Sequence, residues 1–363
     1  MNILHVVGAR PNFMKAAPVH HALKQYGGVY QVVVHTGQHY DFSMSEVFFR
    51  ELGLPTPDVN LEVGSCSHAQ QTSRIMERLE PVVLEHRPDL VLVYGDVNST
   101  VAAALVCAKL QIRVGHVEAG LRSFDRTMPE ELNRLLTDQI SDLLFTPSED
   151  GNHNLAREGV NPSRVHLVGN VMIDTLMCML PMSETHILPG LPPRYALVTL
   201  HRPANVDDPD FLRSLLRVLA EISDELPVLF PVHPRTQQKI RELGAQPNIS
   251  NPNLFFLEPS PYLEFLALQR RAVVVITDSG GIQEETTFLQ VPCLTVRDNT
   301  ERPITVSLGT NTLVGRNPER LRPALDQILA GKARQGSTLP LWDGQAAQRI
   351  ARIVTGITPV SPA

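Results

Sequence analysis

Short runs of β-branched and other apolar residues alternate with longer amphipathic stretches along most of the chain. In the first half, the apolar runs predict strands over Asn2–Val7, Tyr30–His35, Leu90–Tyr94, Val114–Val117, Leu143–Thr146 and Val165–Val168. The stretches between them predict helices over Phe13–Tyr26, Met44–Leu52, Ala69–His86, Thr100–Leu110, Pro129–Ser141 and Glu149–Glu158. Apolar strands separated by helices indicate a parallel sheet that is covered on both faces.

The alternation pauses over Leu176–Arg194, where prolines accumulate, and then begins again. In the second half we expect strands over Ala196–Leu200, Val228–Val232, Leu254–Leu257, Val273–Thr277, Cys293–Val296 and Thr312–Val314. Helices are expected over Asp210–Asp224, Pro261–Leu268, Ile282–Leu289 and Pro318–Leu329. The pattern predicts two doubly wound domains, 1–176 and 177–363, with a ligand cleft between them and a terminal helix at about 344–357 able to pack back on the first domain.

Composition narrows the class of protein. The 363 residues are 43% hydrophobic with a net charge of −6, which describes a globular protein and gives no support to binding of nucleic acid or a membrane surface. The four cysteines are far apart and lack metal-ligand spacing. No apolar run approaches the length of a membrane span, and the N-terminus lacks the pattern of a signal peptide. We therefore expect a reduced, cytoplasmic protein without structural zinc.

The stretch Val114–Arg134 carries the densest candidate chemistry. An apolar strand passes through a glycine-containing turn into a helix at Pro129, with acids on both sides of the turn at Glu118, Asp125, Glu130 and Glu131. Carboxylates in or beside a buried strand suit proton abstraction and delivery. Two structural alternatives stay open: Glu130 can close a capping box with Thr127, and Glu131 can favour the positive end of the helix dipole.

Two other loops follow predicted strands of the first half. The segment GARPNFMK is neither a dinucleotide-binding nor a Walker loop, but Arg10 and Lys15 ahead of a helix are typical of an anion site. Solvated surface charge is the alternative for both residues. Asp96 comes directly after the strand Leu90–Tyr94 and Gly95, where a loop faces the expected cleft, although an aspartate there can also cap a helix.

The second half repeats this arrangement with different chemistry. His201 follows a strand, a place where histidine is often structural but can also titrate or bind phosphate. In VVVITDSGGIQEE, a strand turns through Ser279, Gly280 and Gly281 into a helix, so that backbone N–H groups can approach a phosphate closely. A tight turn that needs glycine for steric reasons alone is the alternative.

Three residues complete the candidate nucleotide site. Glu285, about one turn into that helix, is placed to accept hydrogen bonds from a ribose diol, and Arg302 offers a cation for phosphate. Phe265 can present a flat face to a base, or it can be an ordinary core residue of its helix.

These motifs resemble one family. GARPNFMK, TGQHYD, GDVNST, HVEAGLRS, MPEELNR, GNVMIDTL, LHRPANVD, TDSGGIQEE and TERP, in this order from about residue 2 to residue 315, resemble the UDP-N-acetylglucosamine 2-epimerases of the non-hydrolysing bacterial type. The resemblance implies an α/β fold of two Rossmann-like domains with a central cleft, of the glycosyltransferase-B type, in a homodimer. It implies interconversion of UDP-GlcNAc and UDP-ManNAc by elimination and re-addition of UDP, with no nicotinamide cofactor and no metal.

The resemblance also assigns roles by position. It implies that Asp96, Glu118, Glu130 and His201 are catalytic. The UDP-contacting positions that it implies are Arg10, Lys15, Phe265, Ser279, Gly280, Gly281, Glu285 and Arg302. A second, activating UDP-GlcNAc bound by some members would contact the positions of Gln38, His39, Gln71, Arg202 and His233.

The sequence departs from the family pattern at three places. It reads His201-Arg202-Pro203 where many members have His-Arg-Arg, Ser260 where glutamine is common, and Ile304 where an acid is common. The implied catalytic acids are unchanged. Alternatives are a hydrolysing epimerase that releases free ManNAc, an epimerase for a related UDP-diacetamido sugar, a UDP-sugar sensor on this fold and a glycosyltransferase.

Overall fold

The computed structural model of the chain describes residues 1–37, 52–186, 189–243 and 251–356. In this part of the chain there are two compact units. Unit 1 contains Met1–Thr175 together with the C-terminal segment from Pro340 onward, and unit 2 contains Leu176–Leu339. The expected helix Met44–Leu52 lies, except for its last residue, outside the described residues.

Unit 1 is built on a seven-stranded parallel sheet with the order β3-β2-β1-β4-β5-β6-β7. The strands are β1 (Asn2–Val7), β2 (Tyr30–His35), β3 (Val59–Asn60), β4 (Leu90–Tyr94), β5 (Val114–Val117), β6 (Leu143–Thr146) and β7 (Val165–Leu167). The helices are α1 (Arg10–Lys24), α3 (His68–His86), α4 (Asn98–Lys109), α5 (Pro129–Ile140), α6 (Glu149–Arg157) and α15 (Ala346–Thr355), with a 3₁₀ turn at Pro162–Arg164. The helix α7 (Val171–Ser183) begins in unit 1 and continues into unit 2. The strands predicted for this half are confirmed.

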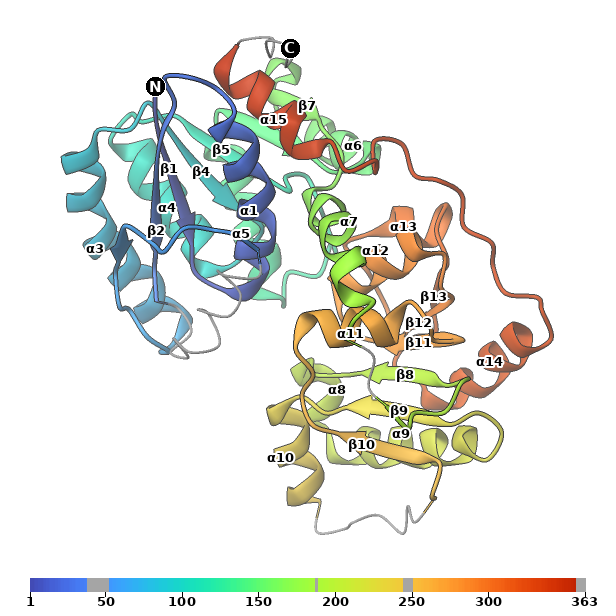
Figure 1. The fold of residues 1–363 in the computed structure, drawn as a ribbon. Coiled ribbons are helices and arrows are strands. Elements are labelled where there is room, and N and C mark those ends of the chain that lie inside the picture. Colours follow the sequence, from blue (N-terminus) through green and yellow to red (C-terminus); the bar gives the residue numbers. More distant parts are fainter. Residues whose placement is uncertain (38–51, 187–188, 244–250, 357–363) are drawn as a thin grey trace. The chain divides into compact units, whose positions relative to one another are not determined.

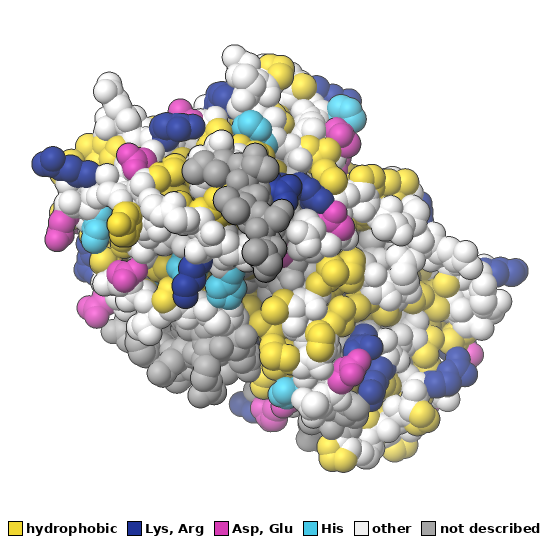
Figure 2. Space-filling model, turned by 45° about the horizontal axis from the view of Figure 1, so that its top comes forward, with side chains coloured by type: hydrophobic (Ala, Val, Ile, Leu, Met, Phe, Trp, Pro, Cys, Tyr) yellow, Lys and Arg dark blue, Asp and Glu magenta, His cyan; other side chains and the backbone are white. Residues whose placement is uncertain are grey.

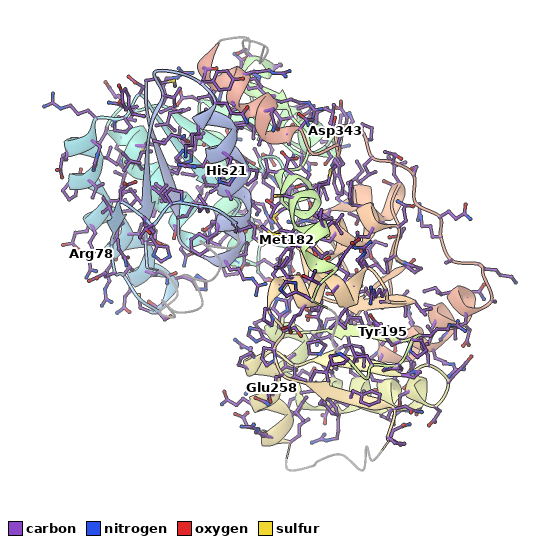
Figure 3. The ribbon with its side chains drawn as sticks, in the orientation of Figure 1. His21, Arg78, Met182, Tyr195, Glu258 and Asp343 are labelled. Atoms are coloured by element: carbon purple, nitrogen blue, oxygen red, sulfur yellow. The ribbon has the colours of Figure 1, made fainter. Side chains whose placement is uncertain are left out.

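Helices cover both faces of this sheet (Figure 1). Leu4 and Val6 of β1 join Val91 and Val93 of β4 in one buried apolar cluster with residues of α3 and α4. The two-residue strand β3, which the apolar pattern is too short to predict, pairs with β2. The Arg78 side chain of α3 donates hydrogen bonds to the Leu61 and Glu62 carbonyls just after β3, at 2.6 and 2.8 Å (Figure 3).

Unit 2 repeats the plan with a six-stranded parallel sheet in the order β10-β9-β8-β11-β12-β13. The strands are β8 (Ala196–Thr199), β9 (Val228–Pro231), β10 (Leu254–Leu257), β11 (Val274–Thr277), β12 (Cys293–Thr295) and β13 (Asn311–Leu313). The helices are α8 (Pro203–Val206), α9 (Pro209–Ser223), α10 (Pro234–Glu242), α11 (Tyr262–Gln269), α12 (Gly280–Leu289), α13 (Pro303–Ser307) and α14 (Leu321–Leu329), with a 3₁₀ turn at Pro318–Arg320. Its larger core cluster lies between the sheet and α9 and α14.

Three helices of unit 2 were not predicted: α8, α10 and α13. Each has a proline in its first turn, at Pro203, Pro234 and Pro303. Proline is favoured at the first helical position because its missing N–H would have no intrahelical partner there and its φ is already helical. The same residue that suggests a loop in the sequence therefore starts a short helix in the structure.

Two features of the region from residue 171 to the C-terminus concern the division of the chain into units. The helix α7 continues through the first part of the proline-rich stretch, and Pro181 lies inside it. The segment from Pro340 onward groups with unit 1, because α15 packs against α1 and its first N–H groups bond to Asp174, which is the arrangement that the sequence allowed for the helix at about 344–357 (Figure 1). On the face shown in Figure 2, the described Lys and Arg side chains are scattered among Asp and Glu side chains.

The strand orders place a topological switch point in each sheet. In unit 1, β1 lies between β2 and β4, so the loops after β1 and β4 leave in opposite directions at the carboxyl edge. In unit 2, β8 lies in the same way between β9 and β11. Ligands of doubly wound α/β folds bind at such points, so these loops are where functional side chains are expected.

Candidate active site

Lys15 lies at the switch point of unit 1 as a buried cation. Asn12 joins the two loops there: its Oδ1 accepts hydrogen bonds from the Gly8 and Ala9 N–H groups at 3.0 Å, and its Nδ2 donates to the Tyr94 carbonyl at 2.7 Å. Lys15, one turn further along α1, is 5% exposed, so it is not the solvated surface charge that the sequence left open. Its Nζ lies so close to Gly95 that a Cβ added there would be 2.7 Å away.

Glu118 is the partner of Lys15. Its Oε2 lies 2.6 Å from Lys15 Nζ, and both side chains are almost fully buried. The Glu118 backbone has φ +75°, a left-handed conformation that costs a non-glycine residue about 1–2 kcal/mol. Both the Glu118 and Ala119 N–H groups donate to the Phe145 carbonyl at 3.1 and 3.0 Å, which holds this bend in place. The ion pair gives the carboxyl edge of the sheet a basic group and an acidic group in contact.

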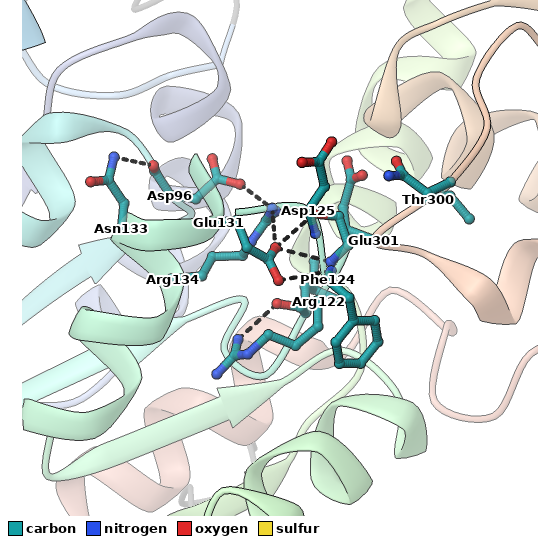
Figure 4. A network of polar contacts seen from close by, with 12 residues as sticks. Asp96, Arg122, Phe124, Asp125, Glu131, Asn133, Arg134, Thr300 and Glu301 are labelled. Carbon is teal, nitrogen blue, oxygen red and sulfur yellow. Dashed lines mark hydrogen bonds and ion pairs between the residues drawn. The ribbon is translucent and has the colours of Figure 1, made fainter. Parts of the chain in front are cut away.

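Asp96 is held by α5, the helix whose first turn contains Glu130 and Glu131. Its Oδ2 accepts a hydrogen bond from Arg134 Nη1 of α5 at 2.8 Å, and its carbonyl accepts one from Asn133 Nδ2 at 2.9 Å (Figure 4). The Arg134 guanidinium is 2% exposed and also donates to Glu131 Oε2 at 2.8 Å. Asp96 itself keeps a quarter of its side chain exposed, at 23%, so it can meet a ligand.

Glu131 is a structural anchor, and this corrects the simpler alternative of a helix-dipole residue. Its Oε2 accepts hydrogen bonds from the Ser123 N–H and hydroxyl at 2.9 and 2.8 Å, and its Oε1 accepts one from the Phe124 N–H at 2.9 Å (Figure 4). With Arg134 as a fourth partner, this 1% exposed carboxylate fixes the loop between β5 and α5.

Glu130 lies in the same helical turn but is half-buried, and it does not form the capping box that its spacing from Thr127 suggested. The N-cap of α5 is Met128, and Thr127 instead donates both its N–H and its hydroxyl to Asp125 Oδ1. The Glu130 carboxylate has no hydrogen bond or ion pair with another described residue, and its partial exposure leaves it accessible to solvent or a ligand.

A buried row of charges behind these loops was missed by the sequence analysis. Asp138 of α5 is fully buried and contacts His116 Nδ1 at 2.6 Å and Arg122 Nη1 at 2.7 Å, while Arg122 also pairs with Glu158 at 2.7 Å. Burial by itself would raise the pKa of the Asp138 carboxyl, but His116 and Arg122 hold that pKa below its usual value. The signal that could have identified this row is His116, a polar residue inside the otherwise apolar strand Val114–Val117.

In unit 2, Asp278 organises the loop that carries His201. The Asp278 carboxylate is completely buried and accepts hydrogen bonds from the His201 and Arg202 N–H groups at 3.2 and 3.0 Å and from Asn205 Nδ2 at 3.1 Å. His201 Nδ1 lies 3.4 Å from Asp278 Oδ1, and 40% of the His201 side chain is exposed. A buried carboxylate thus orients a histidine whose other ring nitrogen can face a ligand.

The turn Ser279-Gly280-Gly281 begins α12. A Cβ on Gly280 would overlap Arg302 Nη1 and Glu301 Oε1, so the buried Arg302–Glu301 pair would have to shift to admit it. A Cβ on Gly281 would meet nothing within 4 Å among the described residues. Steric need therefore explains the first glycine, and the second lies beside open space at a helix N-terminus, a favourable place for an anion.

Arg302 places a buried positive charge beside that N-terminus. Its Nε lies 2.9 Å from Glu284 and its Nη1 lies 2.6 Å from Glu301. Burial would raise the pKa of the Glu301 carboxyl, but Arg302, Arg297 and Arg202 outweigh it and hold that pKa far below its usual value. The cluster is fixed by opposite charges.

The remaining candidate nucleotide contacts have mixed surroundings. Glu285 is 3% exposed, and its Oε1 accepts a hydrogen bond from the Tyr262 hydroxyl at 3.0 Å. Phe265 is half-buried and packs against the second apolar cluster of unit 2, which includes Tyr195 and Leu268. Arg10, in unit 1, is exposed.

The five candidate activator residues lie in different settings. Gln38 and His39 lie outside the described residues. Gln71 is buried, accepts from Asn98 Nδ2 at 2.8 Å and donates to the Gly64 carbonyl at 3.2 Å. Arg202 lies 3.6 Å from Glu301. The His233 ring is 5.6 Å from that of His201, and burial, followed by the charges of His201 and Arg235, lowers its pKa.

Metal-ligand clusters and membrane-spanning helices are both absent from the described residues. Among them, no group of three or more His, Cys, Asp or Glu side chains is arranged to hold a metal ion. Nor does any helix in residues 1–37, 52–186, 189–243 and 251–356 have the length and apolar character needed to cross a membrane.

Two parallel sheets flanked by helices, with acids at the switch point of one and a glycine turn beside an arginine at the switch point of the other, define a two-domain α/β enzyme of the glycosyltransferase-B type. Residues 21–355 match the family described as UDP-N-acetylglucosamine 2-epimerase. The chain belongs to this family and is an enzyme of the epimerase class.

Individual relatives extend over nearly the whole chain. The UDP-N-acetylglucosamine 2-epimerase of Methanocaldococcus jannaschii is 42% identical, covering 98% of this chain and 99% of the relative. The UDP-2,3-diacetamido-2,3-dideoxy-D-glucuronate 2-epimerase of Pseudomonas aeruginosa is also 42% identical, covering 97% and 98%. The crystal structure of the M. jannaschii UDP-GlcNAc 2-epimerase in complex with UDP-GlcNAc and UDP has a TM-score of 0.91 at 41% identity, covering 98% of this chain and 100% of that one.

Proposed function

We propose that the protein interconverts UDP-GlcNAc and UDP-ManNAc without hydrolysis. The C2 proton of the sugar is removed as the C1–O bond to UDP breaks, giving 2-acetamidoglucal and UDP. UDP then re-adds at C1 while C2 receives a proton on the opposite face. The observation that supports the proposal is the set of charged groups at the carboxyl edges of the two sheets: Asp96 and the Lys15–Glu118 pair in unit 1, and the Gly281 turn with Arg302 in unit 2.

The chemistry of these groups suits the reaction. The C2 hydrogen is weakly acidic, so its removal needs a positioned carboxylate base and its return needs an acid on the other face. Asp96, Glu118 and Glu130 supply these proton-transfer groups in the proposal. Departure of the diphosphate is assisted by Arg302, the α12 N-terminus and His201, which stabilise the negative charge that develops on UDP.

The test is incubation of the protein with UDP-GlcNAc in D2O, followed by NMR. Appearance of UDP-ManNAc with deuterium at C2 is the expected result. Free ManNAc in its place would select the hydrolysing alternative, and unchanged UDP-GlcNAc would refute the proposed substrate.

Site variants test the roles of the acids. Asp96→Asn and Glu130→Gln should each lower the epimerisation rate by about 10²-fold or more, because proton transfer by a positioned group is worth about 10²–10⁴-fold. UDP affinity, measured by calorimetry, should stay within about twofold, since UDP is proposed to bind unit 2. Normal turnover of either variant would contradict the role of that acid.

A second substrate has one specific observation in its favour, the 42% identity to the P. aeruginosa diacetamido-glucuronate 2-epimerase. That name describes a uronic acid, whose C6 carboxylate requires a cation that UDP-GlcNAc does not. Parallel D2O incubations with both UDP-sugars, compared by kcat/KM, decide between them.

We further propose, from the family resemblance, that the protein is a homodimer in the cytoplasm. It would supply ManNAc units for a surface polysaccharide. Light scattering on the purified protein tests the dimer: a mass of twice 40.2 kDa is expected, and a monomer would contradict it.

A further inference from the structure

The loops that carry Asp96 and Glu118 both bend through left-handed backbone. Gly95, directly before Asp96, has φ +63°, Glu118 itself has φ +75°, and Gly120 has φ +82°. A Cβ at Gly120 would lie 2.6 Å from the Gly151 carbonyl oxygen, so the second bend is also closely packed. Unusual backbone of this kind persists at functional sites only where surrounding contacts determine it.

One pair of side chains bonds to both bends. His116 Nε2 donates to the Gly95 carbonyl at 2.8 Å, and His116 Nδ1 donates to Asp138 Oδ1 at 2.6 Å. The other oxygen of Asp138, Oδ2, accepts from the Gly120 N–H at 3.1 Å. The chain of bonds Gly95–His116–Asp138–Gly120 therefore ties the residue before Asp96 to the turn just after Glu118.

The geometry also fixes where the protons lie. Both ring nitrogens of His116 face oxygen atoms that accept hydrogen bonds, a carbonyl and a carboxylate, and this arrangement is satisfied on both sides when both nitrogens carry hydrogen. The ring is then an imidazolium, and its charge is balanced by Asp138. Arg122 adds a second cation to Asp138 at 2.7 Å and is itself balanced by Glu158. These groups, apart from Glu158, are at most 1% exposed.

We propose that His116 and Asp138 form a charged clamp that positions the Asp96 and Glu118 carboxylates relative to each other. The effect of this clamp on catalysis rests on the proposed function. Both are positioning residues, because they are buried behind the loops and act through Asp96 and Glu118, which are the groups proposed to transfer protons. An asparagine at 138 removes the negative charge between His116 and Arg122, and its single amide oxygen cannot accept hydrogen bonds both from His116 and from the Gly120 N–H and Arg122 on the other side.

The activity test uses Asp138→Asn in the full-length protein. We expect kcat for epimerisation to fall about tenfold or more, because small misplacements of reacting groups cost rate steeply. KM for UDP-GlcNAc and the Kd for UDP should stay within about twofold. The folded fraction is measured in the same samples by Trp342 fluorescence, so that kcat is expressed per folded molecule.

Asp142→Asn is the matched control. Asp142 follows α5 and its Oδ2 accepts from the Val114 N–H at 2.8 Å, at the opposite end of the same strand β5. The control removes a carboxylate–backbone bond of this strand far from the bends, and we expect kcat per folded molecule to stay within twofold of the wild type. Wild-type kcat in folded Asp138→Asn, or an equal fall in Asp142→Asn, would overturn the proposal.

A spectroscopic measurement on the wild-type protein is independent of activity and of the folding of Asp138→Asn. In protein labelled with ¹⁵N-histidine, the His116 ring, assigned by its loss in His116→Gln, should show both nitrogens protonated. A neutral ring would overturn the clamp even if Asp138→Asn did not fold. Absence of deuterium at C2 in the wild type would instead refute the proposed function and leave this ring measurement to decide the clamp.

Discussion

At the residue scale, neighbouring acids of one type have opposite surroundings. Glu130 and Glu131 both lie in the first turn of α5. Glu131 points inward and accepts hydrogen bonds from Ser123, Phe124 and Arg134. Glu130 is half-buried and has no hydrogen bond or ion pair with another described residue. Neutral variants of the two residues therefore distinguish a carboxylate that stabilises the fold, Glu131, from one that is proposed to transfer protons, Glu130.

We expect Glu131→Gln to lower the free energy of unfolding by about 3 kcal/mol, because it leaves the buried Arg134 charge without one of its two carboxylates. Glu130→Gln should change it by less than about 0.5 kcal/mol, as an ordinary surface substitution does. Urea denaturation of both variants measures the difference. Equal destabilisation of the two would show that the inward-facing bonds of Glu131 add nothing.

At the element scale, the first turn of α12 contains two glycines with different reasons for being there. Gly280 is enclosed by Arg302 and Glu301, whereas the described residues leave space around Gly281. The helix can therefore accept an added methyl group at Gly281 more easily than at Gly280.

Gly280→Ala should destabilise the protein by about 1–3 kcal/mol, because the added Cβ displaces the Arg302–Glu301 pair. Gly281→Ala should leave the free energy of unfolding unchanged or raise it by up to about 1 kcal/mol, since alanine favours the helix. Thermal unfolding of the two variants side by side provides the measurement. A result with the order reversed would contradict the packing argument.

At the scale of the whole molecule, the chain returns to its first unit at the end. The Asp174 carboxylate accepts hydrogen bonds from the Ala346 and Ala347 N–H groups at 3.2 and 2.7 Å, at the start of α15. Trp342, the single tryptophan of the sequence, donates its ring N–H to the Pro147 carbonyl at 3.1 Å. Its fluorescence therefore reports on this part of unit 1.

Asp174 makes the stability of this unit depend on pH. Burial raises the pKa of its carboxyl from 3.8 to about 6, against the opposing effect of the two N–H groups. A raised pKa means that the folded state binds the proton more tightly, so the stabilisation is full below about pH 4 and is lost as the pH rises through about 6.

The unfolding free energy of the wild type minus that of Asp174→Asn should therefore fall by up to about 3 kcal/mol between pH 4 and pH 7. Urea denaturation followed by Trp342 fluorescence measures it. The same difference for Asp210→Asn, whose side chain is 92% exposed, should be nearly flat. A difference that rises with pH for Asp174→Asn would contradict the assigned direction.

Local pattern was sufficient for most elements and for the chemistry of the loops. The described strands other than the two-residue β3 were predicted because buried parallel strands are continuous apolar runs, and the Gly280–Gly281 turn was predicted because glycine marks it. The helices that begin at Pro203, Pro234 and Pro303 were missed because proline indicates a loop as readily as a first helical turn.

The sequence by itself determined the two-sheet plan, the family and the set of candidate acids and cations, because these depend on residue type and on spacing along the chain. Only the tertiary structure decided which charges meet: Lys15 with Glu118, Arg134 with Asp96 and His116 with Asp138. Each of these pairs joins residues from separate elements, and an ion pair leaves no periodic trace in the sequence. Its energy depends on a distance and a degree of burial that exist only after the sheet has formed.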